Sequence, residues 1–252
     1  GGDPTVRKGI DVVFAMDVSN SMLATDVQPD RLTKAKDLIR QVLRQTPDNR
    51  VALVLFAGQA YVQVPLTTDY SAAQLLINAA APSTVAAQGT AISDALKKTE
   101  IALATSEDRY KALVLITDGE THDEEAVNVA KELASKGVII NTVGIGSPQG
   151  TTIIDETTGQ AKVDASGSPV ISKLNEAILR EIAAAASGDY IYLQDVATAA
   201  RNITGLFAAA DKKAVVDTSL LNYNTLYMWV AAPMLLVLLA DVFFPDRKKA
   251  KS

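Results

Sequence analysis

Five oxygen-bearing side chains stand at points of the sequence where a strand would end or a helix would begin. Asp17, Ser19 and Ser21 come directly after an apolar run. Thr90 precedes an amphipathic stretch, and Asp118 ends a second apolar run. Carboxylate and hydroxyl oxygens are the ligands that a hard divalent cation such as Mg²⁺ prefers. Together the five residues predict a site for Mg²⁺, with Mn²⁺ or Ca²⁺ as alternatives.

Each part of this pattern also has a purely structural interpretation. Asp17, Ser19 and Ser21 could satisfy free backbone N–H groups in a loop, as Asp and Ser commonly do. Thr90 could be only a helix N-cap, and Asp118 could form only a turn with the glycine after it. An Asp-x-Ser-x-Ser run alone is expected by chance in about one chain in ten of this length. The metal prediction therefore rests on all three parts occurring in order.

Apolar runs alternate with amphipathic stretches along the chain, a pattern typical of an α/β fold with a largely parallel sheet. A three-residue connection between the second and third strands indicates a hairpin, which makes one edge strand antiparallel. Asp30, Asp69 and Ser172 are predicted N-caps. Residues 146–170 are expected to form a loop with a small hairpin turning at Thr158-Gly159. The expected strands are 10–17, 50–56, 61–66, 110–117, 138–145 and 190–193, and the expected helices, with their predicted caps, are 30–46, 69–80, 90–105, 123–135, 172–186 and 198–212.

The five predicted ligands resemble the metal-ion-dependent adhesion site (MIDAS) of the von Willebrand factor type A domain. Four longer stretches resemble the Bat (aerotolerance-operon) membrane proteins, BatB-like members in particular. Family members usually carry a membrane helix before this point, so a chain beginning Gly1-Gly2 without Met is expected to be a truncated or processed form. The four stretches are 7–14, 56–66, 88–92 and 115–120.

The resemblance implies a doubly wound, mostly parallel six-stranded sheet of the von Willebrand A or Rossmann-like type, with strand order 3-2-1-4-5-6. Asp17 and Asp118 would then end neighbouring strands where ligands bind in such sheets. In the family the two carboxylates often act through water, which leaves the cation electrophilic. An acidic residue of a partner protein can supply the sixth ligand. The resemblance also implies other Bat-family membrane proteins and a MoxR-type AAA+ ATPase as partners, in an envelope complex linked to stress and aerotolerance.

A partner-binding rim is expected around this site. Met22 and Leu23 follow the first motif and would be exposed apolar residues beside a cation, which suits an interface. Their alternative role is packing under the loop. Gly89, with the 83–89 loop, and Glu120 complete the predicted rim.

Composition excludes several kinds of chemistry. The 252 residues contain no Cys and one His, so disulfides, thiolate sites and His-based zinc or triad chemistry are not expected. Residues 1–240 carry 20 basic and 27 acidic side chains, which argues against nucleic acid binding. The last residues are basic, so the net charge of the whole chain, −5, is less negative than that of residues 1–240.

Residues 226–244 form an apolar run with one charge, Asp241. As a helix the run would span about 28 Å, close to the hydrocarbon thickness of a bilayer. A buried core helix is the alternative. Arg247, Lys248 and Lys249 follow the run, and by the positive-inside rule they place the C-terminus in the cytoplasm and the domain in the periplasm, anchored to the inner membrane. The expected division is a juxtamembrane segment 1–9, a von Willebrand factor type A domain 10–212, a linker 213–225, a transmembrane helix 226–244 and a basic tail 245–252.

Three classes of function remain. The first is a membrane-anchored, metal-dependent protein–protein interaction module, and the others are a metal-dependent phosphohydrolase and a surface adhesin. Hydrolysis needs a nucleophile or a positioned base, and Glu120 is the only nearby candidate. No catalytic residue is predicted, and the interaction module is favoured over an enzyme.

Overall fold

The centre of the fold is a strand in which every residue is buried. β1 (Asp11–Asp17) pairs in parallel with β2 (Arg50–Phe56) on one side and with β4 (Lys111–Thr117) on the other. Strands covered on both faces read as continuous apolar runs, which is why these three are recognisable in the sequence. The computed structural model describes residues 9–106, 109–121, 123–154, 158–164 and 166–210, all within one of the two compact units of the chain, 7–211.

The sheet has six strands in the order β3-β2-β1-β4-β5-β8, which confirms the predicted order. β5 (Val138–Gly144) and β8 (Tyr190–Tyr192) continue the parallel part of the sheet. The edge strand β3 (Ala60–Thr67) is antiparallel to β2, as the hairpin signal predicted. The predicted mostly parallel sheet with one antiparallel edge strand is therefore confirmed.

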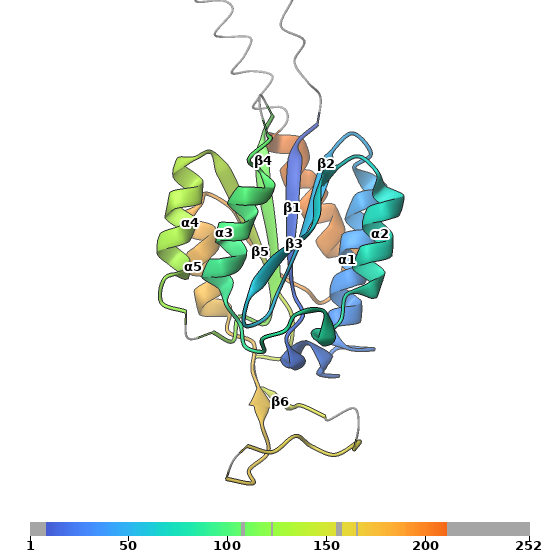
Figure 1. Ribbon diagram of the computed structural model, residues 1–252, viewed down its shortest axis with the longest axis vertical. Coiled ribbons are helices and arrows are strands. Elements are labelled where there is room, and N and C mark those ends of the chain that lie inside the picture. Colours follow the sequence, from blue (N-terminus) through green and yellow to red (C-terminus); the bar gives the residue numbers. More distant parts are fainter. Residues whose placement is uncertain (1–8, 107–108, 122, 155–157, 165, 211–252) are drawn as a thin grey trace, which may run out of the picture. The chain divides into compact units, whose positions relative to one another are not determined.

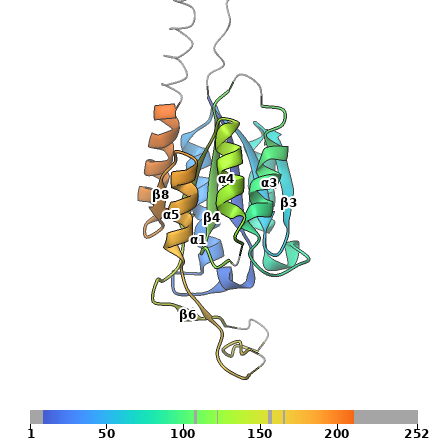
Figure 2. The same ribbon diagram turned by 90° about the vertical axis from the view of Figure 1, so that its left-hand side faces the viewer.

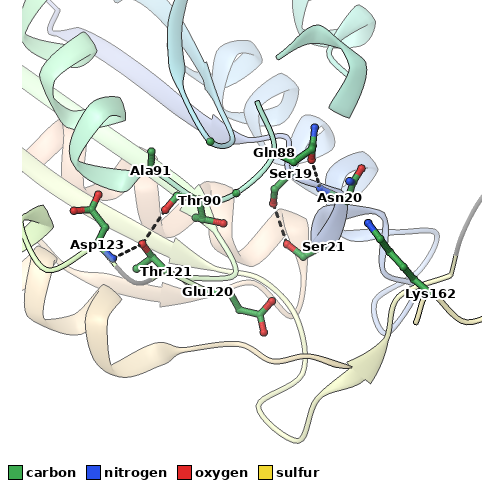
Figure 3. Close-up of a pocket in the computed structure, with 12 residues that line it drawn as sticks. Ser19, Asn20, Ser21, Gln88, Thr90, Ala91, Glu120, Thr121, Asp123 and Lys162 are labelled. Carbon is green, nitrogen blue, oxygen red and sulfur yellow. Dashed lines mark hydrogen bonds between the residues drawn. The ribbon is translucent and has the colours of Figure 1, made fainter. Parts of the chain in front are cut away.

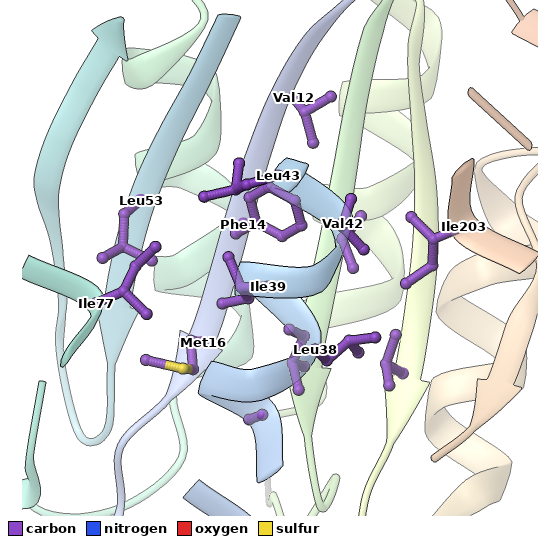
Figure 4. Close-up of a cluster of buried hydrophobic side chains, with 14 of the residues drawn as sticks. Val12, Phe14, Met16, Leu38, Ile39, Val42, Leu43, Leu53, Ile77 and Ile203 are labelled. Atoms are coloured by element: carbon purple, nitrogen blue, oxygen red, sulfur yellow. The ribbon is translucent and has the colours of Figure 1, made fainter. Parts of the chain in front are cut away.

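Helices cover both faces of the sheet (Figures 1 and 2). Side chains of β1 alternate between two apolar clusters because successive residues of a strand point to opposite faces. Val12, Phe14 and Met16 belong to the first cluster, which also contains Leu38 and Ile39 of the neighbouring helix (Figure 4). The first cluster is covered by α1 (Arg31–Gln45), α2 (Tyr70–Ala79) and a helix at 196–210, and the second by α3 (Ile92–Ala102), α4 (Ala126–Ser135) and α5 (Glu176–Ala185).

Two of the three predicted caps are confirmed. Asp30 accepts a hydrogen bond from the backbone N–H of Thr33 at 2.7 Å, and Asp69 accepts one from Ala72 at 3.0 Å. The prediction for Ser172 is wrong, because this residue lies in strand β7 (Ile171–Ser172) and α5 begins four residues later. Its hydroxyl is engaged by side chains of the site described below.

The loop between β5 and α5 folds back on itself at the carboxyl end of the sheet. β6 (Thr151–Thr152) pairs antiparallel with β7, and an isolated bridge joins Ile154 to Ala161 around Gly159. Gly159 has φ +70°, in keeping with the turn predicted there. We call residues 151–154, 158–164 and 166–172 the arm; it extends beyond the end of the sheet (Figure 2).

No helix in the described part of the chain is long and apolar enough to cross a bilayer. The predicted transmembrane helix 226–244 lies outside the described residues, as do the linker, the basic tail and residues 1–8.

Candidate metal centre

The carboxylate of Asp17 is completely buried where β1 ends. Its Oδ1 accepts a hydrogen bond from the backbone N–H of Ser19 at 2.8 Å. Its Oδ2 accepts one from the Thr117 hydroxyl at 2.6 Å, and Thr117 is the last residue of the neighbouring strand β4. These two bonds fix the carboxylate between the ends of the two central strands.

The hydroxyl oxygens of Ser19 and Ser21 lie 2.9 Å apart (Figure 3). Two adjacent ligands of an octahedral Mg²⁺ are about 3.0 Å apart, because each lies about 2.1 Å from the ion. Ser19 stands at the N-cap position of the short 3₁₀ helix η1 (Asn20–Leu23), but its side chain forms no capping bond. The observed spacing therefore fits cation ligands better than a capping role.

The position of Thr90 at the candidate site depends on a close contact between two backbone segments. Gly58, just past β2, donates to the carbonyl of Ala87 at 2.8 Å, and a Cβ at position 58 would lie 2.4 Å from the Gln88 carbonyl oxygen. Ala91, not Thr90, is the N-cap of α3, so the structural interpretation of Thr90 is wrong. The loop around Thr90 can lie against the end of β2 only because residue 58 has no side chain.

Asp118 is also completely buried, one residue beyond β4. Its Oδ1 accepts from the backbone N–H of Glu120 at 3.2 Å, so the predicted turn is present. Its Oδ2 accepts from Nη1 of Arg31 at 2.8 Å, a partner that was not predicted from the sequence. One signal was available: Arg31 is cationic in the first turn of a helix, where the helix dipole disfavours positive charge.

The two buried carboxylates differ in how their charge is offset. Among the described residues, Arg31 forms an ion pair with Asp118, and no basic side chain forms one with Asp17. Burial, and secondly the negative charge of Asp118, raises the pKa of Asp17 to about 7. A divalent cation here would stabilise the ionised form of Asp17.

A cavity of about 610 Å³ adjoins the hydroxyl residues of the candidate site. The described residues include no cluster of three His, Asp or Glu side chains that could hold a metal, so a cation here would depend on hydroxyl ligands. The cavity is lined by three predicted ligands, Ser19, Ser21 and Thr90, by the predicted rim residues Gly89 and Glu120, and by Asn20, Gly58, Gln88, Ala91, Thr121, Asp123 and Lys162 (Figure 3).

The predicted apolar rim is wrong for Met22. Its side chain is completely buried in the first apolar cluster, and Leu23 is partly buried against the same cluster. The 3₁₀ turn of η1 places Met22 in the core close to α1, while Ser21 lines the cavity. Asn20 and Gln88 lie at the rim instead, joined by a 3.2 Å hydrogen bond from the Asn20 backbone N–H to Gln88 Oε1.

Glu120 is half-buried beside the cavity, and its Oε1 accepts from the backbone N–H of Lys173 at 2.6 Å. Burial, with a further contribution from the charge of Asp118, raises the pKa of Glu120. Its carboxylate is thus tied to the chain that follows the arm.

Comparisons with known proteins agree with this architecture. The sequence profile of the von Willebrand factor type A domain matches residues 12–120. The crystal structure of conserved hypothetical protein BatB from Bacteroides thetaiotaomicron is 37% identical, with a TM-score of 0.78, and the match covers 81% of this chain and 100% of that one. An aerotolerance-related membrane protein from Bacteroides fragilis NCTC 9343 is also 37% identical over the same shares of the two chains, with a TM-score of 0.76.

A sequence relative is the UPF0353 protein of Mycolicibacterium gilvum (strain PYR-GCK), 32% identical over 169 residues. That match covers 61% of this chain and 49% of the relative, so the chain spans about half the length of such relatives. The sheet order, the profile match and the two Bacteroides structures lead to one conclusion. The chain belongs to the von Willebrand factor type A domain family, and it is similar to BatB and to an aerotolerance-related membrane protein.

Proposed function

We propose that this domain binds a divalent cation, Mg²⁺ or else Mn²⁺ or Ca²⁺, and through it a protein partner. The observation that carries the proposal is the pair of hydroxyls 2.9 Å apart at an open cavity, beside a buried carboxylate without a basic partner among the described residues. Ser19, Ser21 and Thr90 would hold the cation, with Asp17 and Asp118 acting directly or through water. The predicted ligands that line the cavity, Ser19, Ser21 and Thr90, are neutral hydroxyls. The cation would therefore remain electrophilic and bind a partner's carboxylate.

The partners we propose are other Bat-family membrane proteins and a MoxR-type AAA+ ATPase. The support is the similarity to BatB and to an aerotolerance-related membrane protein. The chain would act as one subunit of a membrane complex linked to stress and aerotolerance.

Binding is favoured over catalysis. Glu120 is the candidate base for a phosphohydrolase, but its Oε1 is already engaged by a backbone N–H at 2.6 Å. A metal-dependent turnover of generic phosphate esters that disappears when Ser19 and Ser21 are replaced would move the protein into the enzyme class. Binding of a ligand outside the cell would instead favour the adhesin.

The tagged full chain, solubilised from membranes, is expected to retain a protein partner in Mg²⁺ and to release it in EDTA. Adding Mg²⁺ back should restore capture, because the cation is part of the interface. Replacing Ser19 and Ser21 by alanine should abolish capture as EDTA does, and Ser106→Ala is the matched control for that variant. The buried Ser106 hydroxyl donates to the carboxylate of Asp11, the first residue of β1, at 2.6 Å. It lies at the opposite end of the sheet from the candidate site. Capture that is indifferent to EDTA would place the interface elsewhere.

The domain is proposed to face the periplasm, anchored by 226–244. The basic residues Arg247, Lys248 and Lys249 motivate this orientation. Protease added to intact spheroplasts should therefore digest the domain. Digestion only after lysis would reverse the orientation and place the domain on the side of a cytoplasmic ATPase.

A further inference from the structure

Arg31 is a completely buried arginine whose guanidinium nitrogens are all engaged. Nε and Nη2 donate to the two carboxylate oxygens of Asp26, at 2.8 and 2.7 Å. Nη1 donates to Asp118 Oδ2 at 2.8 Å and to the Ser172 hydroxyl at 2.6 Å. A planar guanidinium can meet three groups in fixed directions in this way, which a lysine ammonium cannot do.

The last residue of the arm and the segment that precedes the arm meet at this guanidinium and its Asp26 partner. Ser172, in β7, is bound to it directly. Ser147, just before β6, donates its backbone N–H to Asp26 Oδ2 at 2.6 Å, the same oxygen that accepts from Arg31. The segments that flank the arm are also joined to each other by a 3.1 Å bond from Leu174 N–H to the Ser147 carbonyl.

The backbone next to Arg31 leaves no space for the guanidinium to move. Gly146, with φ +119°, passes so close that a Cβ there would lie 2.7 Å from Arg31 Cζ. A side chain at this position is disfavoured by the backbone conformation as well as by the contact. The fold therefore fixes the guanidinium between the arm and the end of β4.

The same contacts limit what Asp118 can offer a cation. Oδ2 has two acceptor positions, and it faces Arg31 at 2.8 Å and the Ser172 hydroxyl at 3.4 Å. Oδ1 accepts one bond, from Glu120, and keeps one acceptor position. Asp118 can thus turn a single lone pair toward the site, and its charge is partly offset by Arg31 before any cation binds.

We propose that Arg31 is a positioning residue that joins the metal site to the arm. It withholds Asp118 Oδ2 from the cation, which keeps the cation electrophilic for a partner's carboxylate. It also fixes both ends of the arm, so that Lys162 is held at the wall of the same cavity. This inference rests on the proposed function, because it assigns the residue that tunes the proposed site.

The test compares the Arg31→Gln variant with the unaltered protein, both as full-length chains in detergent. Removing one positive charge beside the site should tighten Mn²⁺ binding by about tenfold or more, measured by the loss of the free Mn²⁺ signal in electron paramagnetic resonance. A purely structural role of Arg31 predicts equal or weaker binding. Arg50→Gln is the matched control, because Arg50 pairs with the buried Asp11 at the opposite end of the sheet and should leave Mn²⁺ affinity unchanged.

Amide hydrogen exchange in the arm gives a second readout. The N–H groups of Lys162 and Val170 are bonded within the arm, at 2.7 Å each, and should exchange faster in Arg31→Gln. Ser172→Ala is a milder variant that keeps the pair between Arg31 and Asp118, and it should also speed exchange in the arm. Should Arg31→Gln fail to fold, unchanged arm exchange in Ser172→Ala would overturn the inference, and faster exchange would support it.

The two proposals fail in distinguishable ways. Absence of Mn²⁺ binding by the unaltered chain would reject the proposed function. The exchange measurement would still test whether Arg31 fixes the arm. Binding by the unaltered chain together with equal or weaker binding by a folded Arg31→Gln would reject only the role of Arg31.

Discussion

Replacing Ser19 and Ser21 together by alanine is expected to weaken Mg²⁺ or Mn²⁺ binding at least about a hundredfold, measured by calorimetry. Both residues line the cavity, and their hydroxyls hydrogen-bond to each other at 2.9 Å. Loss of a group that only supports a metal ligand costs about 10–100-fold in affinity, so loss of two ligands should cost at least as much. The fold should persist, because alanine fits both positions and the Asp17 carboxylate, which the Ser19 hydroxyl also contacts, keeps its bonds to the backbone N–H of Ser19 and to the Thr117 hydroxyl.

The serine pair is a cleaner test than Asp118→Ala. Asp17 and Asp118 are completely buried, and the two serines are nearly so. Removing the Asp118 carboxylate would also leave Arg31 buried with one counterion fewer, which destabilises the fold. Unchanged metal affinity in the folded serine variant, with Ser106→Ala as control, would reject the site.

Metal affinity is expected to fall as the pH drops through about 7. A ligand carboxylate must be ionised to stabilise the cation, and burial raises the pKa of Asp17 to about 7. Below this pH a proton competes with the cation, so affinity should fall by about tenfold for each further pH unit. Calorimetric titrations with Mn²⁺ between pH 8 and 5.5 check this, and an affinity that is constant over this range would contradict it.

The same carboxyl should affect the metal-free protein in the opposite direction. Because the folded-state pKa of Asp17 lies above its unfolded value of 3.8, the folded state binds the proton more tightly. The contribution of Asp17 to stability is therefore greatest at low pH and is lost as the pH rises to about 7. Asp17→Asn should remove this part of the pH dependence of metal-free unfolding between about pH 4 and 7.

The central strands were recognisable in the sequence because they are buried on both faces, whereas their order was what the family resemblance implied. The continuous apolar runs around Phe14 and Leu115 are typical of interior strands, and both are buried strands in the structure. Asp17 and Asp118 end adjacent strands, so the strand order alone brings them close together. The caps at Asp30 and Asp69 were predictable because a capping bond is local in sequence.

Contacts between distant segments were not predictable in this way. Arg31 meets Asp118 across 87 positions and Ser172 across 141, and no local pattern reports either contact. Ser172 looked like a helix cap because serine before an amphipathic stretch usually is one. Met22 looked exposed because the direction of its side chain depends on the 3₁₀ turn, which the Asp-x-Ser-x-Ser motif does not reveal.

The candidate metal site can be tested directly by the anomalous scattering of Mn²⁺ in crystals of the domain grown at pH 8. We expect one strong peak within about 2.3 Å of the hydroxyl oxygens of Ser19 and Ser21, with Thr90 and the two buried carboxylates around it. We also expect a carboxylate or a water molecule, and no side chain of the same chain, to complete the shell on the side of the cavity. The absence of such a peak at saturating Mn²⁺, or a peak bound only by Glu120 and Asp123, would contradict it.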